Sequence, residues 1–116
     1  MKKQMNQEIK TKWLEALRSG EYKQGKGILK DDKDNYCCLG VLCQIHSKET
    51  NTEWGVNEGN NLFNYLNDSF ALPNVVFNWA NLESQSPMIG EISLIFSNDD
   101  LGYSFNQIAD EIEKHL

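Results

Sequence analysis

The last thirteen residues constrain the fold most strongly, because two independent helix signals coincide there. Ser104 and Gln107 have the spacing of a capping box, in which the two side chains satisfy the first backbone N–H groups of a helix. Apolar residues then recur at helical spacing, namely Phe105, Ile108, Ala109, Ile112 and Leu116. The segment therefore predicts an amphipathic helix with one face in the core.

A second amphipathic helix is predicted over residues 6–18. Its apolar residues fall on one side at helical spacing, namely Ile9, Trp13, Leu14 and Leu17. Asn6 is typical of an N-cap and Gly20 of a helix stop. Trp13 is therefore expected in the core, as is Trp79 on a later apolar stripe.

Residues 22–38 have a different character. Glycines weaken a helix there, and the Asp- and Asn-rich residues 31–35 predict a turn, so we expect two short strands that form a hairpin around it. A strand ending near Cys38 then passes into a helix through about Ser47. Gly40 inside that helix indicates the close approach of another backbone.

The second half of the chain gives weaker signals. A short helix is predicted near residues 61–66 and a better one over 72–82, with Pro73 at a favoured first position. Residues 89–96 fit either a strand or a short helix, and residues 98–102 predict a turn. The patterns together predict an α+β, mostly helical single domain over residues 1–116, with a small antiparallel β-hairpin or sheet.

Charge and composition narrow the function classes. The net charge of −6 argues against non-specific binding to nucleic acid or to an anionic membrane, and it is compatible with a basic protein partner. No apolar run has the length of a signal peptide core or a membrane span, so a cytoplasmic protein is expected. Self-association is left open.

The cysteines invite a metal or a nucleophile interpretation. Cys37, Cys38, Cys43 and His46 do not have the paired spacing of a zinc site, and their apolar neighbours would raise a thiol pKa. We therefore expect reduced, buried, structural thiols and no bound metal or cofactor. No strong catalytic motif is present, and no catalytic residue is predicted.

A binding segment is the most specific functional prediction. Glycines expose backbone N–H groups beside two lysines in the segment Tyr22, Lys23, Gln24, Gly25 and Lys26, which could hold an anion or phosphate. Trp54, in a polar loop, is the aromatic residue best placed to stack on a ligand or anchor a partner, although burial is the favoured alternative. Asn98 and Asp99, in the predicted turn, complete the candidate ligand-binding set.

The chain resembles a family of small uncharacterised proteins of tailed bacteriophages and prophages. The resemblance rests on the segments at 13–24 (WLEALRSGEYKQ) and 36–43 (YCCLGVLC), a Leu-Pro helix at 72–79, the Asn-Asp pair at 98–99 and the segment 104–109 (SFNQIA). It covers nearly the whole chain, and it departs in the turn after Asp99 and in the asparagine-rich middle. It implies a phage setting, in the cytoplasm of the infected bacterial host, and it carries over no activity.

Three functions are compatible with these patterns. The favoured one is a binding protein that counters host defence, either by sequestering a small nucleotide signal or by covering the basic surface of a host effector protein. One alternative is a structural or packaging accessory. The other is a small nucleotide hydrolase that uses carboxylates such as Asp31, Asp34 or Asp99.

Overall fold

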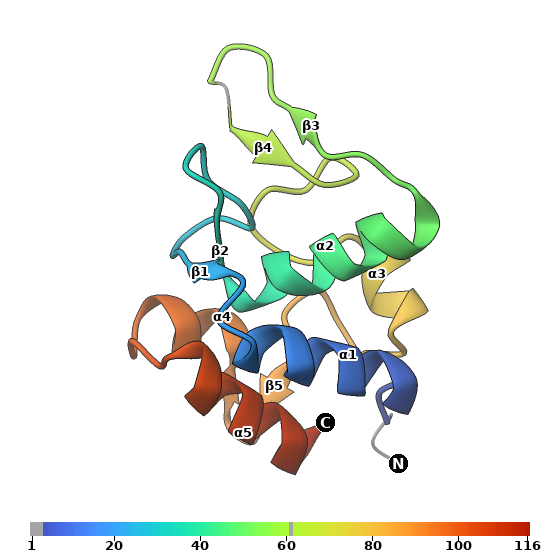
Figure 1. Cartoon of the computed structure of the whole chain (residues 1–116), viewed down its shortest axis with the longest axis vertical. Coiled ribbons are helices and arrows are strands. Elements are labelled where there is room, and N and C mark those ends of the chain that lie inside the picture. Colours follow the sequence, from blue (N-terminus) through green and yellow to red (C-terminus); the bar gives the residue numbers. More distant parts are fainter. Residues whose placement is uncertain (1–3, 61) are drawn as a thin grey trace.

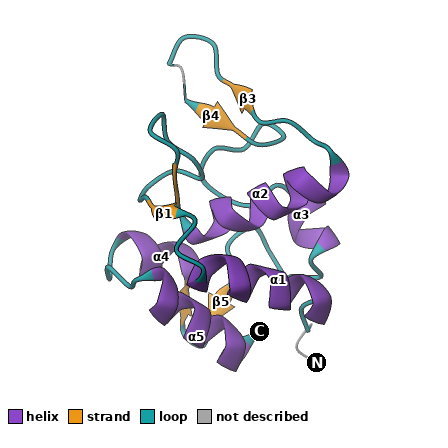
Figure 2. Cartoon of the chain, viewed as in Figure 1, coloured by secondary structure: helices purple, strands orange, loops and turns teal. Residues whose placement is uncertain are grey.

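A computed structural model describes residues 4–60 and 62–116 of the chain. The fold is α+β and mostly helical, with small two-stranded sheets (Figures 1 and 2), as the sequence predicted. Its elements in chain order are α1 (Gln7–Arg18), β1 (Lys23–Gln24), β2 (Asn35–Tyr36), α2 (Cys38–Thr50), β3 (Gly55–Val56), β4 (Phe63–Asn64), α3 (Asn74–Trp79), β5 (Met88–Ile89), β6 (Ile92–Ser93), α4 (Leu94–Asp99) and α5 (Phe105–His115).

The two terminal helices pack against each other, with α5 beside α1 in Figure 1. Both begin as predicted: the Asn6 side chain accepts a hydrogen bond from the backbone N–H of Ile9, and Ser104 and Gln107 form a complete capping box. The predicted apolar stripes of both helices face the core. Arg18 on α1 bridges to α5 through the carboxylates of Asp110 and Glu113, at 2.8 and 3.0 Å.

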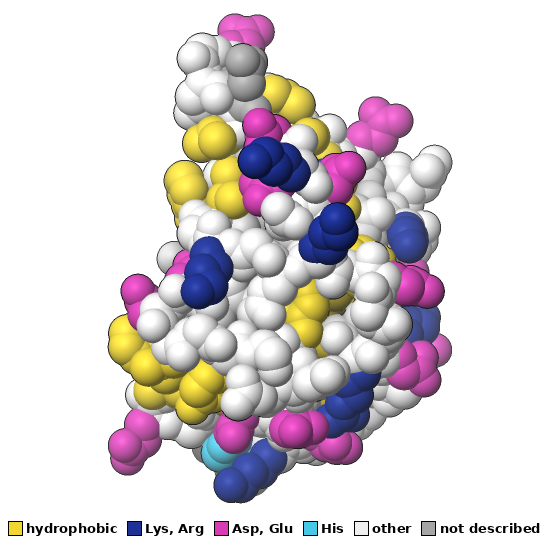
Figure 3. All heavy atoms as spheres, turned by 60° about the vertical axis from the view of Figure 1, so that its left-hand side comes forward, with side chains coloured by type: hydrophobic (Ala, Val, Ile, Leu, Met, Phe, Trp, Pro, Cys, Tyr) yellow, Lys and Arg dark blue, Asp and Glu magenta, His cyan; other side chains and the backbone are white. Residues whose placement is uncertain are grey.

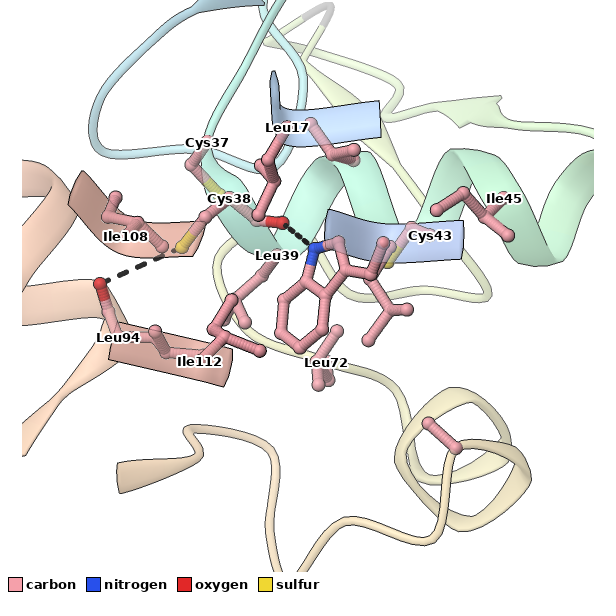
Figure 4. Close-up of a cluster of buried hydrophobic side chains, with 14 of the residues drawn as sticks. Leu17, Cys37, Cys38, Leu39, Cys43, Ile45, Leu72, Leu94, Ile108 and Ile112 are labelled. Atoms are coloured by element: carbon pink, nitrogen blue, oxygen red, sulfur yellow. Dashed lines mark hydrogen bonds between the residues drawn. The ribbon is translucent and has the colours of Figure 1, made fainter. Parts of the chain in front are cut away.

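Helix α2 lies at the centre of the core, and most of its length is buried. A helix buried on most sides needs little amphipathic contrast, which explains why its sequence pattern was ambiguous. Gly40 confirms the predicted close approach, because a Cβ atom there would lie 1.8 Å from the backbone oxygen of Leu29. The indole N–H of Trp13 donates to the carbonyl of Cys38 at 3.0 Å. Figure 4 shows the Cys38 thiol directed at the carbonyl of Leu94 in the same core.

The hairpin predicted within residues 22–36 is wrong in its main pairing. β1 and β2 run parallel, with Gln24 opposite Tyr36, and only the isolated bridge between Lys30 and Tyr36 is antiparallel. The backbone of Tyr36 therefore lies between those of Gln24 and Lys30. The chain reverses before Leu29, where Gly27 has a φ of +78°, and again at the predicted turn. Two reversals return β2 to the direction of β1.

The helix predicted near residues 61–66 is also wrong. Phe63 and Asn64 form β4, which pairs antiparallel with β3, and the prediction at Asn61 lies outside the described residues. Leu66 and Asn67 have φ values of +51° and +75°, which a right-handed helix does not allow. The antiparallel pairs are therefore β3–β4 and β5–β6, whereas the predicted antiparallel hairpin lay within residues 22–36.

Two further segments differ from their predictions. The helix predicted over 72–82 is shorter, because Pro73 is its N-cap and the chain leaves the helix before Asn81, whose φ is +59°. The ambiguous residues 89–96 contain both strand and helix, because the β5–β6 hairpin leads directly into α4. Asn98 and Asp99 therefore lie in α4, and not in the predicted turn, which begins after them.

Candidate functional site

The predicted ligand residues around Asn98 meet, but they do so inside the protein. The Asn98 side chain is buried, and its Oδ1 accepts from Gln24 Nε2 at 2.8 Å and from the backbone N–H of Cys38 at 3.3 Å. Its Nδ2 donates to the carbonyl of Gly25 and to the carboxylate of Asp99, at 2.9 and 2.8 Å. Asn98 therefore joins β1, the start of α2 and α4, and its amide is fully engaged.

The glycine-lysine segment is also engaged through its amides. Gln24 Nε2 donates a second hydrogen bond to the carbonyl of Tyr103 at 2.7 Å, and the N–H of Gly25 donates to the carbonyl of Tyr36 at 2.7 Å. The Gln24 amide and the Gly25 N–H were predicted as donors to an anion, and both donate within the protein instead. The groups of the segment that remain exposed are the side chains of Lys23 and Lys26.

The two predicted aromatic residues belong to one row of ring contacts. Tyr22 meets Tyr36 edge-on at 5.3 Å between ring centroids, and Tyr36 meets Trp54 at 6.2 Å. Trp54 is half-buried, since it also contacts Tyr65 at 4.9 Å and its indole N–H donates to Gln44 Oε1 at 2.8 Å. Trp54 is therefore a half-buried member of this row of rings, and it also contacts the ammonium of Lys30.

Lys30 is the residue that sequence reasoning missed. Its ammonium lies over three rings, at 5.7 Å from the centroid of Tyr36, 5.4 Å from Trp54 and 4.6 Å from Phe63. Only 15% of the Lys30 side chain is exposed, and its ion pair with Asp34 is long at 3.7 Å, with a carboxylate side chain that is 78% exposed. The ring faces attract the cation but carry no net charge, so they do not neutralise it.

A cavity of about 380 Å³ opens beside Lys30, between the loop at residues 28–32 and the β3–β4 hairpin. We call it the Lys30 pocket, and it is lined by Ile28, Lys30, Asp31, Asp32, Asn60, Leu62 and Phe63. In Figure 1 the hairpin projects from the helical part of the molecule. The pocket thus combines one cation, apolar walls and two carboxylates at its edge.

The two carboxylates differ in how they are engaged. Asp31 accepts hydrogen bonds from the backbone N–H groups of Lys33 and Asn35, both at 2.9 Å. Partial burial acts to raise the pKa of Asp31, but the hydrogen bonds from Asn35 and Lys33 together hold it below its usual value. Asp31 therefore stabilises its own turn, whereas Asp32 is exposed at the rim and available to a ligand.

The cysteine and histidine cluster forms part of the core. Cys37, Cys38 and Cys43 are free and buried, so the predicted burial of these thiols is confirmed. Burial raises the pKa of Cys37 to about 11 and those of the other two well above the usual value, so none is activated as a thiolate. His46 shares a 2.6 Å hydrogen bond with the hydroxyl of Tyr65. Within residues 4–60 and 62–116, no group of three acidic, histidine or cysteine side chains has the arrangement of a metal site.

The comparisons with known proteins identify the family. The chain belongs to the family described as a domain of unknown function, DUF8296, whose model matches residues 5–116. No curated protein and no solved structure matches it significantly. In the part of the chain that the structure describes, no helix is both long enough and apolar enough to cross a membrane.

Proposed function

We propose that this protein acts by stoichiometric binding, and that the Lys30 pocket takes a small organic anion of the nucleotide class. The observation that carries the proposal is the Lys30 ammonium, which lies over three rings at the wall of a cavity. Its one ion pair with the described residues is long, at 3.7 Å. A cation that is largely withdrawn from water and weakly neutralised gains from an anionic partner.

The walls of the pocket favour a ligand with an apolar or aromatic body. Ile28, Leu62 and Phe63 offer apolar surface, and the exposed carboxylate of Asp32 can accept a hydrogen bond from an amino group or a sugar hydroxyl. The volume of about 380 Å³ falls in the usual range for small-molecule sites, about 300–1,000 Å³. A phosphate on Lys30 with a base against the apolar wall would use all of these features.

Binding is favoured over hydrolysis because two of the three carboxylates predicted for a hydrolase already accept hydrogen bonds within the protein. Asp31 accepts from its own turn and Asp99 accepts from Asn98, whereas Asp34 is exposed and has a long ion pair with Lys30. The resemblance to phage and prophage proteins supports a specific setting for such binding. We place the protein in the cytoplasm of an infected bacterium, where it would sequester a nucleotide signal of host defence.

Isothermal titration calorimetry of the wild-type protein tests the proposal. The probes are a panel of linear and cyclic mono- and dinucleotides at physiological ionic strength. We expect saturable binding of at least one nucleotide, with a stoichiometry of one ligand per chain. A panel that gives no heat of binding and no rise in melting temperature would overturn the nucleotide proposal for the compounds tested.

The glycine-lysine segment provides a second, independent arm of this test. Lys23 lies on β1, which pairs with β2, and Lys30 bridges the other side of the same Tyr36. If the exposed lysines extend the site, then Lys23→Ala/Lys26→Ala weakens nucleotide binding and leaves the fold intact. A partner with a basic protein surface predicts the opposite, because removal of two positive charges would leave its association unchanged or faster.

A further inference from the structure

Charge is strongly segregated along this chain. Residues 49–113 contain eleven of the seventeen carboxylates and none of the eleven Lys and Arg residues, so their formal charge is −11 and that of the remaining residues is +5. The large apolar side chains that the described structure leaves exposed fall in the same stretch: Val56, Leu62, Leu66, Phe70, Val75, Met88, Phe96 and Leu101. The large exposed apolar side chains therefore lie in the same stretch of sequence as most of the carboxylates.

Both properties meet at the end of α4. The carbonyl of Phe96 accepts hydrogen bonds from the N–H groups of Asp100 and Leu101, at 2.9 and 3.0 Å, so the chain folds back over the last turn of the helix. Phe96 is 44% exposed and Leu101 is 46% exposed. We call Phe96, Asp99, Asp100 and Leu101 the α4-end patch. In Figure 3, apolar side chains gather at the lower left of the surface, with acidic side chains near them.

Among residues 4–60 and 62–116, the carboxylates of the α4-end patch form no ion pair. The ion pairs formed among residues 4–60 and 62–116 use other carboxylates, namely Asp34, Glu49, Asp110, Glu111 and Glu113. The Asp99 carboxylate accepts a hydrogen bond from the neutral amide of Asn98, and Asp100 is exposed. The patch thus combines two carboxylates and two exposed apolar side chains within residues 96–101, and protein interfaces typically place a polar rim around an apolar contact.

We infer that the α4-end patch docks a protein segment that presents apolar side chains flanked by Lys or Arg. Complementary charge would steer such a segment to the patch, and the apolar pair would then hold it. A symmetric contact with a second copy would place Asp99 and Asp100 opposite the same residues, and an anionic membrane would repel them. This inference does not depend on the Lys30 pocket, which involves different residues.

Fluorescence anisotropy with a labelled, short helical peptide of leucine and lysine tests this inference on the full chain. Asp100→Asn/Leu101→Ser removes one charge and one exposed aliphatic side chain from the patch. Glu58→Gln/Val75→Ser is the matched control, because Glu58 is exposed and Val75 is 57% exposed on other elements. We expect the first variant to bind the peptide about tenfold more weakly, which equals about 1.4 kcal/mol, and the control to change by less than about twofold.

Other results would either overturn the inference or assign the patch to a second copy of the chain. Equal losses in the two variants, or equally tight binding of a matched leucine-glutamate peptide, would overturn the assignment, as would the absence of binding by the wild type. A wild-type dimer in sedimentation velocity that dissociates in the Asp100→Asn/Leu101→Ser variant would assign the patch to a second copy instead. If that double variant unfolds, Asp100→Asn alone replaces it, with Glu58→Gln as control, and a weaker dependence of peptide binding on salt is expected.

Discussion

Gly40→Ala gives the most quantitative test of the packing described above. In an exposed helix this substitution stabilises by about 1 kcal/mol, because alanine is the better helix former. Here the new Cβ would lie 1.8 Å from the oxygen, 2.7 Å from the carbonyl carbon and 3.2 Å from the Cα of Leu29. All three atoms belong to the backbone, so no side-chain rotation relieves the overlap.

The cost follows from what must move. An ordinary contact needs the Leu29 backbone to shift by roughly 1.5 Å, and that backbone accepts from Cys37 N–H and donates to the Ser69 carbonyl. Overpacking of this kind, with loss of buried hydrogen bonds, costs more than the helix gain, and we expect a net loss of at least about 3 kcal/mol. For a chain of this size, that lowers the melting temperature by about 12 °C or more.

Urea unfolding followed by circular dichroism measures this loss. Gly27→Ala is the control, because its Cβ meets no atom within 4 Å and the only penalty is a φ of +78°. That backbone penalty is roughly 1–2 kcal/mol. If Gly40→Ala equals or exceeds the wild type in stability, then residues 25–30 do not pack on α2 as described, and the position of Lys30 loses its support.

Three further predictions concern the core. Ile112→Ala should lower the free energy of unfolding by roughly 2–4 kcal/mol in urea titration, and a loss below about 0.5 kcal/mol would place the α5 stripe outside the core. The thiols of Cys37, Cys38 and Cys43 should react with a disulfide reagent only after denaturant is added, because burial raises their pKa values; rapid reaction in the native protein would contradict this. Burial lowers the pKa of His46, so the unfolded state takes up its proton first, and stability should fall as the pH drops below about 6.5. Thermal unfolding between about pH 7.5 and 5.5 should show this fall in the wild type and a smaller one in His46→Gln; equal slopes would exclude His46 as the cause.

The sequence predicted those parts of the fold that depend on local signals. In each terminal helix a capping residue and an apolar stripe predicted the same element, and both helices occur as predicted. Gly40 also gave a correct long-range inference, since a glycine inside a buried helix needs a packing reason. The β1–β2 pairing was not accessible in the same way, because two strands of two residues have no periodicity. Their direction depends on two chain reversals, in which Gly27 and Asp34 have positive φ values.

The candidate site shows the same division. Gln24 and the backbone N–H of Gly25 were predicted as donors to a ligand, but tertiary contacts direct both into the protein, where Gln24 meets the buried Asn98. Trp54 was predicted to be either buried or an anchor for a ligand; it is half-buried, and its ring centroid lies 5.4 Å from the Lys30 ammonium. Lys30 had no local signal, because its environment comes from rings at positions 36, 54 and 63 that only the folded chain brings together.

The central claim is that the Lys30 ammonium binds the anionic group of a nucleotide, and one calorimetric comparison tests it most directly. Lys30→Met removes the charge but keeps an unbranched apolar side chain over the rings, whereas Lys33→Met removes the same charge from an exposed neighbour. The probe is the nucleotide that binds the wild type most tightly in the panel. A lost charge-assisted hydrogen bond of about 1.5–3 kcal/mol predicts roughly 10- to 150-fold weaker binding to Lys30→Met, and less than about twofold for Lys33→Met. Equal affinities of the two variants for that nucleotide would contradict the claim.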